Sequence, residues 1–414
     1  MNTFDQYESN VRSYCRVFPD VFSKAENSTL ISESGKKFID FWAGAGALNY
    51  GHNNPYIIEK IISYLQSGGI LHALDLQTVA KREFIEIFQN SILKPKNLNF
   101  KIQFCGPTGT NGVEASFKLA RKVKKRQDIF SFTGSYHGMT LGSLAATSGN
   151  DIRNGAGVPL NNIVFFPYPG EIYKNINCLD YMETVLSDDH SGISLPAAVI
   201  LETLQAEGGV NAADIEFLRK LRDLCDRRDI LLICDDVQVG CYRTGPFFSF
   251  EKAGITPDIV ILSKSISGCG FPMSILLMKP ELDIWNPGEH NGTFRGYQPA
   301  LIGAKAAIEF SLNNSIEKKV AEKEVIIKKY LEEQIAAIDK NIKFRGTGMI
   351  WGIDCSSLKI TAKEIASECY KKGLVIEKAG RNDSVLKIMP PLTIDTLLLK
   401  NGLDIIRDSL MQFF

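Results

Sequence analysis

The chain has 414 residues, 44% of them hydrophobic and 23% charged, which is the composition of an ordinary folded protein with a sizeable core. Lys and Arg together number 47, and so do Asp and Glu, so the formal net charge is zero. This balance argues against a protein that binds nucleic acid or an anionic membrane through an excess of positive charge.

The sequence also argues against a secreted, membrane or metal protein. No apolar run approaches the roughly 20 residues that a membrane helix needs, and the first residues lack the pattern of a signal peptide. The 9 cysteines contain no CxxC pair and the 5 histidines no HExxH motif, so we expect no metal site. Scattered cysteines of this kind are typical of reduced, buried thiols. We therefore predict a cytoplasmic protein.

The first predicted element is a β-hairpin. Residues 29–40 read as two short strands with a turn at Glu33-Ser-Gly35. We assign residues 1–60 to an N-terminal segment that contributes to a small domain.

The middle of the chain alternates strands and helices. Continuous apolar runs are typical of strands that are covered on both faces. Such runs occupy residues 128–133, 163–166, 197–202, 230–234 and 258–262. Residues 215–229 between them have the apolar spacing of a helix. This alternation predicts an α/β fold with a mostly parallel sheet, and we assign residues 61–308 to this large domain.

The last quarter has a different pattern. Residues 315–340 read as a long, charged amphipathic helix. Two strand-like stretches follow, residues 343–354 and 385–389, with a helical stretch between them. We assign residues 309–414 to a smaller α+β domain.

A glycine-rich turn opens a predicted helix at Gly106-Pro-Thr-Gly-Thr-Asn-Gly112. Free backbone N–H groups and the positive end of the helix dipole can bind a phosphate there. The stretch is neither a P-loop nor a GxGxxG fingerprint. The alternative is a helix cap that binds no ligand.

An acid and a lysine follow two of the predicted strands. Asp235 and Asp236 end one strand, and Lys264 ends another 29 residues later, about one strand-plus-helix unit. Ligands of open α/β sheets lie at such strand ends. We expect Asp236 to be an exposed loop acid. A phosphate cradle, an acid and a lysine are the groups that pyridoxal phosphate requires.

The chain resembles the class-III aminotransferases, which have the fold of type I pyridoxal-phosphate enzymes. Beyond the segments above, the resemblance rests on Ser135-Tyr-His-Gly138, Leu201-Glu-Thr-Leu-Gln-Ala-Glu-Gly-Gly209, Asp235-Asp-Val-Gln238, Arg243-Thr-Gly245 and Gly292-Thr-Phe294. Within that class the chain is most similar to the diaminobutyrate–2-oxoglutarate aminotransferases. That similarity lies in residues 8–19, 41–55, 74–76 and 287–296.

The resemblance implies two catalytic residues. Lys264 would form the Schiff base with pyridoxal phosphate and carry the proton. Asp235 would pair with the pyridinium nitrogen, and Gln238 would bond the ring hydroxyl. Glu202 would order the region from Asp235 to Gln238, because this chain has Thr203 where the class often has proline.

The resemblance also implies how the rest of the cofactor is bound. Gly109 and Thr110 would donate backbone N–H groups to the phosphate, and Tyr136 would stack on the ring. Thr293 would contact the phosphate of the other subunit, which requires a homodimer or higher homo-oligomer with shared active sites.

Two further residues are candidates for substrate binding. In related enzymes a glutamate pairs with an arginine and releases it to bind the substrate carboxylate; here the matching residues are Glu207 and Lys387. A lysine supplies charge without a bidentate fork. Arg295 or another arginine could take this part instead, and a plain structural ion pair between Glu207 and Lys387 is the other alternative.

The sequence therefore predicts a pyridoxal-phosphate-dependent transaminase that acts on small molecules. The favoured reaction interconverts L-2,4-diaminobutyrate plus 2-oxoglutarate with aspartate 4-semialdehyde plus glutamate. The alternatives are another ω-aminotransferase, for ornithine, acetylornithine or 4-aminobutyrate, and a non-catalytic binding protein on the same fold.

Overall fold

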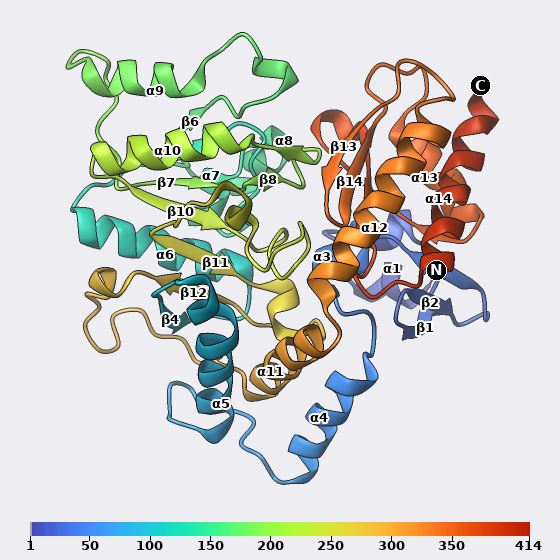
Figure 1. The fold of residues 1–414 in the computed structure, drawn as a ribbon, viewed down its shortest axis with the longest axis horizontal. Coiled ribbons are helices and arrows are strands. Elements are labelled where there is room, and N and C mark those ends of the chain that lie inside the picture. The colour runs from blue at the N-terminus through green and yellow to red at the C-terminus, as the bar shows by residue number, and fades with distance from the viewer. Residues whose placement is uncertain (1) are drawn as a thin grey trace.

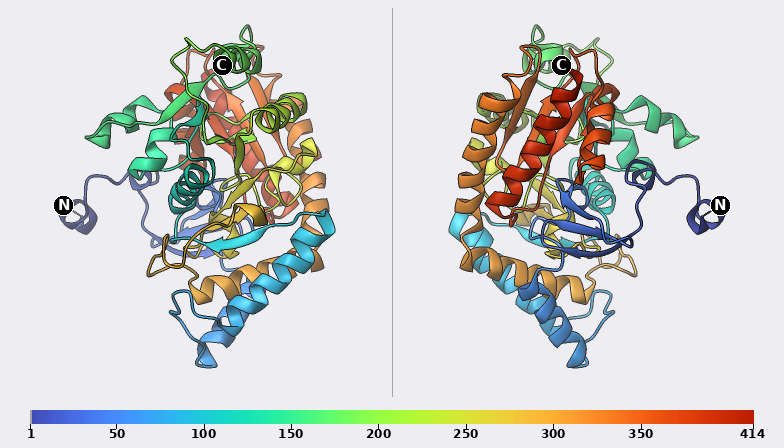
Figure 2. Two further views of the ribbon diagram at one scale, coloured as in Figure 1. Left: turned by 90° about the vertical axis from the view of Figure 1, so that its left-hand side faces the viewer. Right: turned by 90° about the vertical axis from the view of Figure 1, so that its right-hand side faces the viewer.

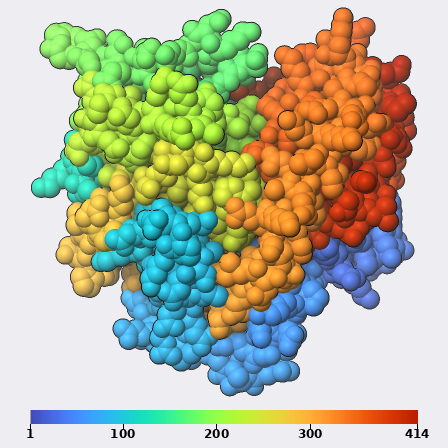
Figure 3. All heavy atoms as spheres, viewed as in Figure 1, coloured from blue at the N-terminus to red at the C-terminus, as the bar shows by residue number. Residues whose placement is uncertain are grey.

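The computed structural model describes residues 2–414, and Figure 1 shows two lobes beside each other. One lobe is built on a seven-stranded sheet, and the other contains the C-terminal part of the chain together with the N-terminal strands. On the face seen in Figure 3, helix α12 (Ile316–Tyr330) runs along the side of the second lobe that adjoins the first.

The central sheet has the strand order β4-β12-β11-β10-β7-β5-β6. Its strands are β4 (Lys101–Phe104), β5 (Ile129–Phe132), β6 (Ile163–Phe166), β7 (Ala198–Leu201), β10 (Leu231–Asp235), β11 (Ile259–Leu262) and β12 (Ile275–Met278). Strands β11, β10, β7, β5 and β6 are parallel, and β12 is antiparallel to both of its neighbours. The prediction of a mostly parallel sheet is confirmed, and its five predicted strands all form.

Successive residues of the central strands belong to cores on opposite faces of the sheet, as the two-residue period of a strand requires. Leu232 and Val260 pack in the core that contains helix α10 (Ile215–Arg227), whereas Ile233 and Ile261 pack in the core that contains helix α6 (Gly109–Lys124). Both faces are therefore covered, which explains why these strands read as continuous apolar runs.

Helix α10 illustrates how the sequence sets an element. The Asp214 carboxylate accepts a hydrogen bond from Phe217 N at 2.7 Å and caps the first turn. Leu218, Leu221 and Leu224 are buried on one face of the helix. The apolar face thus fixes how the helix lies on the sheet.

The second lobe contains an antiparallel sheet in the order β13-β14-β17-β16. Its strands are β13 (Lys343–Thr347), β14 (Ile350–Asp354), β16 (Glu377–Ala379) and β17 (Val385–Ile388). Residues 343–354 were expected to be one strand-like stretch, and this is wrong: they form the hairpin β13–β14. The turn passes through Gly348, whose φ is +57°, and a Cβ there would lie 2.5 Å from the Arg243 carbonyl oxygen.

Three helices accompany this sheet, of which the first two were predicted and the third was not. The predicted helix of residues 315–340 forms as α12 and continues in a π-helical turn, Leu331–Ile335. The other two helices of the lobe are α13 (Ala362–Lys371) and α14 (Thr396–Leu410).

The N-terminal segment joins the second lobe through a small sheet, β1-β2-β3-β15. Its strands are β1 (Phe22–Glu26), β2 (Thr29–Ser32), β3 (Lys37–Asp40) and β15 (Leu374–Val375). Strands β2 and β3 form the predicted hairpin, and β3 pairs in parallel with β15. The proposed domain boundaries stay a prediction.

Figure 2 shows the short helix that begins at Thr3 projecting away from the body of the molecule in both views. The remaining α-helices and strands are α1 (Thr3–Tyr7), α2 (Tyr14–Val17), α3 (Ala43–Gly46), α4 (Pro55–Gln66), α5 (Val79–Ile87), α7 (Leu141–Ala146), α8 (Asn150–Arg153), α9 (Cys178–Ser187), α11 (Gln298–Asn313), β8 (Leu204–Gln205) and β9 (Asn211–Ala212). Among residues 2–414, no helix is both long and apolar enough to cross a membrane.

Candidate active site

A pocket of about 280 Å³ lies where strands β10 and β11 end. Seven of the site residues predicted from the sequence line this pocket, and they come from segments far apart in the sequence. The lining includes Gly109, Thr110, Tyr136, Glu207, Asp235, Gln238 and Lys264. The fold therefore brings together most of the site that the motifs predicted.

The first turn of helix α6 forms one wall of the pocket. Thr108 caps the helix, and its N–H and hydroxyl donate to Asn111 Oδ1 at 3.2 and 2.8 Å. A Cβ on Gly109 would lie 3.0 Å from a methyl of Val237, so glycine allows helix α6 to approach the end of β10 closely. The free N–H groups of this first turn give the wall the chemistry of a phosphate site.

Asp235 is the last residue of β10 and is 4% exposed. Its Oδ1 accepts a hydrogen bond from Val237 N at 3.1 Å, and its Oδ2 lies 2.7 Å from His137 Nδ1. Both oxygens are thereby held in place at the pocket wall. The carboxylate can pair with a cationic ring nitrogen.

His137 is a residue that the sequence reasoning missed. It is buried against Asp235, and its Nε2 has no hydrogen-bond partner among the described residues 2–414. A signal was present, because His137 directly follows Tyr136 in a segment already singled out. What the sequence does not reveal is which of the acids it contacts.

Asp236 was expected to be an exposed loop acid, and this is wrong. It is 1% exposed, and its carboxylate accepts hydrogen bonds from the backbone N–H of Ser249, at 2.9 Å, and from the Ser249 hydroxyl. Burial raises the pKa of Asp236 to about 6. Neighbouring side chains at a strand end point in opposite directions, so Asp235 faces the pocket and Asp236 faces the protein interior.

Lys264 follows β11 directly and begins a 3-10 turn, Lys264–Ser267, with a φ of +51°. Strands β10 and β11 are neighbours, with Asp235 opposite Ile261, so the lysine and the acid reach the same pocket. Burial lowers the pKa of Lys264, although Glu207 opposes the shift. No carboxylate in residues 2–414 makes an ion pair with it. The amine is therefore easier to deprotonate than an exposed lysine, as a nucleophile requires.

Tyr136 and Glu202 also line the pocket. Tyr136 is 38% exposed and lines the pocket with its ring. Glu202 was expected to order residues 235–238, but its carboxylate instead accepts a hydrogen bond from Tyr136 N at 3.1 Å. Burial and the nearby Asp235 raise the pKa of Glu202. Glu202 thus holds the segment that carries the aromatic ring.

Glu207 and Lys387 form an ion pair at 2.6 Å beside the pocket. Lys387 Nζ is fully buried and lies 2.9 Å from a second carboxylate, that of Glu377. Gln238 Nε2 donates to Glu207 Oε1 at 3.1 Å and to the Ala45 carbonyl oxygen at 2.8 Å. The predicted acid and lysine therefore meet, and Glu377 joins them.

Thr293 and Arg295 lie apart from this pocket. Thr293 is exposed, and its carbonyl oxygen lies 2.8 Å from His72 Nε2. Arg295 makes an ion pair with Asp75 at 2.7 Å. Within one chain, neither residue lines the pocket that contains Lys264.

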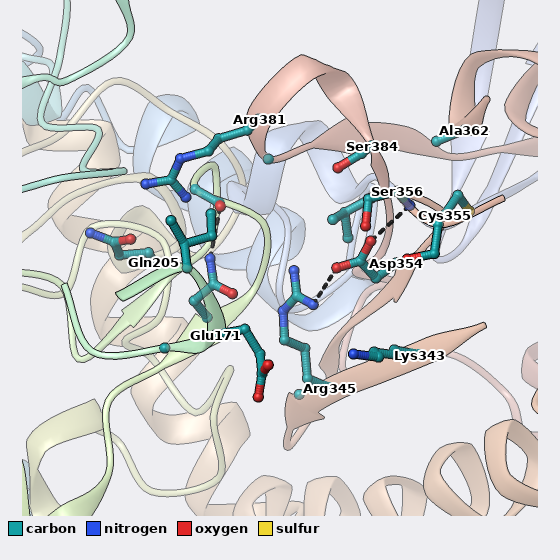
Figure 4. Close-up of a pocket in the computed structure, with 18 of the residues that line it drawn as sticks. Glu171, Gln205, Lys343, Arg345, Asp354, Cys355, Ser356, Ala362, Arg381 and Ser384 are labelled. Carbon is teal, nitrogen blue, oxygen red and sulfur yellow. Dashed lines mark hydrogen bonds and ion pairs between the residues drawn. The ribbon is translucent and has the colours of Figure 1, made fainter. Parts of the chain in front are cut away.

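A second and larger hollow, about 1100 Å³, separates the two lobes (Figure 4). Arg345 spans part of it and makes an ion pair with Asp354 at 2.8 Å. None of the predicted site residues lines this hollow. The chemistry of its lining therefore favours the smaller pocket at the ends of β10 and β11 as the candidate active site.

Comparison with known proteins gives the same assignment. The sequence pattern of the family "Aminotransferase class-III" matches residues 12–410. The chain belongs to the class-III aminotransferases. It is an enzyme of the transaminase type, whose substrates are small amino donors and keto acids, and pyridoxal phosphate is the cofactor of this family. The predictions of family, fold, enzyme class and cofactor are confirmed, and the alternative of a non-catalytic binding protein is set aside.

Individual relatives extend over almost the entire chain. A diaminobutyrate–2-oxoglutarate transaminase of Halalkalibacterium halodurans is 50% identical over 99% of this chain and 96% of its own length. An uncharacterized aminotransferase of Sinorhizobium fredii is 50% identical over 98% of this chain and 91% of its own. The solved ornithine aminotransferase of Toxoplasma gondii superposes with a TM-score of 0.86 at 22% identity, covering 99% of this chain and 94% of that one. At that identity the likeness concerns the fold alone.

Proposed function

We propose that this class-III aminotransferase transfers the 4-amino group of L-2,4-diaminobutyrate to 2-oxoglutarate, or runs the same reaction in reverse from aspartate 4-semialdehyde and glutamate. The observation that carries the proposal is the identity of about 50%, over nearly the whole chain, to several diaminobutyrate–2-oxoglutarate transaminases. Ornithine, acetylornithine and 4-aminobutyrate are the competing donors.

The lining of the pocket fits pyridoxal phosphate. The N–H groups of Gly109 and Thr110 would bind the phosphate, and Lys264, whose amine has no ion-pair partner in residues 2–414, would hold the cofactor covalently. Asp235 would pair with the ring nitrogen, Gln238 would bond the ring hydroxyl, and the ring of Tyr136 would stack on the cofactor. When bound, the cofactor supplies an electron sink that lets an amino group leave one substrate and join another.

Residues of the chain would provide proton transfer, a partner for the ring nitrogen and binding of the substrate. The lowered pKa of Lys264 allows Nζ to accept a proton from the substrate carbon and return it. Asp235, fixed by Val237 N and His137, would present its carboxylate to the ring nitrogen. Glu207 and Lys387 would present one carboxylate and one ammonium to the far end of the substrate, so that diamino acids and dicarboxylates can take turns there.

We further propose a homodimer in which Thr293 completes the partner's phosphate site. Large apolar side chains are exposed around the loop that contains Thr293. An exposed apolar cluster of this kind favours an interface between protein chains. These side chains include Ile70, Leu71, Leu74, Leu76, Phe294 and Tyr297. The exposed position of Thr293, outside the pocket of its own chain, also supports a role across an interface.

A cytoplasmic location is part of the proposal. All nine cysteines are unpaired, and seven of them are buried. Free thiols of this kind are typical of proteins from reducing compartments.

A donor panel tests the proposed reaction. Purified enzyme is incubated with 2-oxoglutarate and, separately, diaminobutyrate, ornithine, acetylornithine or 4-aminobutyrate, and glutamate is measured. We expect diaminobutyrate to give the highest kcat/KM. A higher value for any other donor would replace the proposed substrate, and no turnover with any of them would overturn the proposed function.

A further inference from the structure

Three charged side chains meet at one buried point beside the pocket. Lys387 carries one positive charge, and Glu207 and Glu377 lie 2.6 and 2.9 Å from its Nζ. One ammonium against two carboxylates leaves a net charge of −1 if both acids are ionised. A buried unbalanced charge is costly, and taking up one proton removes it.

The two acids differ in how firmly they are held. Glu377 is the direct cross-strand neighbour of Lys387 in the β16–β17 pair, and its side chain is 7% exposed. Glu207 lies on the connection between β8 and β9, and its side chain is 28% exposed. Glu207 can therefore leave Lys387 when a substrate enters, whereas Glu377 is fixed to Lys387 by the sheet.

We propose that Glu377 is a positioning residue that takes up a proton when the carboxylate of a substrate reaches Lys387, and that it thereby sets the affinity of the site for dicarboxylates. The inference rests on the proposed function, because it takes Lys387 as the group that receives the carboxylate. The proton comes from solvent on binding and returns on release.

The ionisable groups that face Glu377 determine its pKa, and so whether it takes up a proton when a carboxylate binds. They are Lys387 on β17, Glu207, Lys264 after β11, and the phenol of Tyr14 on α2, whose own pKa is raised by burial and by Glu377. Burial is the largest influence on Glu377; together with Glu207 it outweighs Lys387 and raises the pKa of Glu377 to about 7.

Glu207 still lines the pocket after it has left Lys387, so an incoming carboxylate adds one more negative charge near Glu377 and raises this pKa further. The bound state then holds more protons than the free state, so the affinity for the carboxylate falls as pH rises through about 7. A shift of one pKa unit corresponds to about a tenfold change in affinity.

The test uses the holoenzyme and glutarate, a dicarboxylate that has no amino or keto group to react. The dissociation constant is measured from pH 6 to pH 9 for the wild type, Glu377→Gln and the control Asp354→Asn, which removes another partly buried acid from the same sheet. We expect Glu377→Gln to bind glutarate as the wild type does at pH 6 and about tenfold more tightly than the wild type at pH 9. The control should follow the wild type at every pH.

Calorimetry of the wild type in two buffers of different ionisation enthalpy counts the protons taken up on glutarate binding, and does not depend on a variant that folds. We expect uptake near pH 7.5, reduced in Glu377→Gln. Equal or weaker binding by Glu377→Gln at pH 9, or no proton uptake by the wild type, would overturn the inference. Turnover of the wild type with the donor panel is unaffected by either result, so failure of this inference is distinguishable from failure of the proposed function.

Discussion

Two lysines lie near the same pocket in opposite surroundings. Lys264, in the lobe of the parallel sheet, has no ion-pair partner in the described residues 2–414, and burial lowers its pKa. For Lys387, in the other lobe, burial acts in the same direction, but Glu207 and Glu377 outweigh it and raise the pKa. Burial alone therefore does not decide what a lysine does. The carboxylates beside it separate an amine that can form a covalent bond from an ammonium that can only attract charge.

The largest expected effect is the loss of the unpaired lysine. Lys264→Ala removes the amine that would hold the cofactor and move the proton, so we expect essentially no turnover and no covalent cofactor. Activity with the best donor of the panel and the absorbance of the purified protein measure this. Lys101→Ala, which removes an exposed lysine from β4 of the same sheet, is the matched control and should keep normal turnover. Near-normal transamination by Lys264→Ala would contradict the assignment of Lys264 as the lysine that holds the cofactor and moves the proton.

Removal of the paired lysine should lower the stability of the fold in addition to weakening the binding of the substrate carboxylate. Lys387→Met leaves the carboxylates of Glu207 and Glu377 buried without a cation, which costs about 3–5 kcal/mol of unfolding free energy. Urea denaturation of the variant beside the wild type measures the loss. Lys387→Arg keeps the charge and should lose much less. Equal stability of Lys387→Met and the wild type would mean that the three groups are not paired in solution.

The strand order explains why much of the site was predictable. Asp235 and Lys264 lie 29 residues apart and end neighbouring parallel strands, as the apolar runs indicate, although the connection contains only a 3-10 helix, Ser249–Ala253, where a longer helix was expected. The register between β16 and β17, which places Glu377 against Lys387, has no comparable signal in the sequence. The inward direction of Asp236 depends on Ser249, which the sequence does not bring near it. Contacts that depend on side-chain direction or on the register of short strands were therefore missed.

A substitution at Asp235 tests a second predicted catalytic residue in the lobe that contains Lys264. Asp235→Asn keeps the shape of the side chain but removes the negative charge that would face the ring nitrogen. The loss of a charge-assisted hydrogen bond worth about 2–3 kcal/mol in the transition state corresponds to roughly 30- to 150-fold in kcat. Steady-state kinetics at saturating cofactor measure this. If only the affinity for the cofactor changed, the assigned role would be wrong.

The smallest expected signal is a partial recovery of activity in mixed dimers, and it concerns Thr293, which lies outside the pocket of its own chain. Two inactive proteins, Lys264→Ala and Thr293→Trp, are mixed under conditions that exchange subunits. In a mixed dimer with shared sites, one site carries both defects and the other carries none, so activity should return to at most about half of the wild-type value per mixed dimer. No recovery after demonstrated exchange would place the phosphate site within one chain.

The most direct test of the difference between the two lysines is to reduce the purified holoenzyme with borohydride, digest it and locate the cofactor by mass spectrometry. Borohydride makes a lysine–cofactor linkage permanent, so the measurement reports which amine was free to form it. The account predicts the added mass on Lys264 and none on Lys387. Added mass on Lys387 or any other lysine, or no labelled peptide from protein that contains bound cofactor, would contradict it.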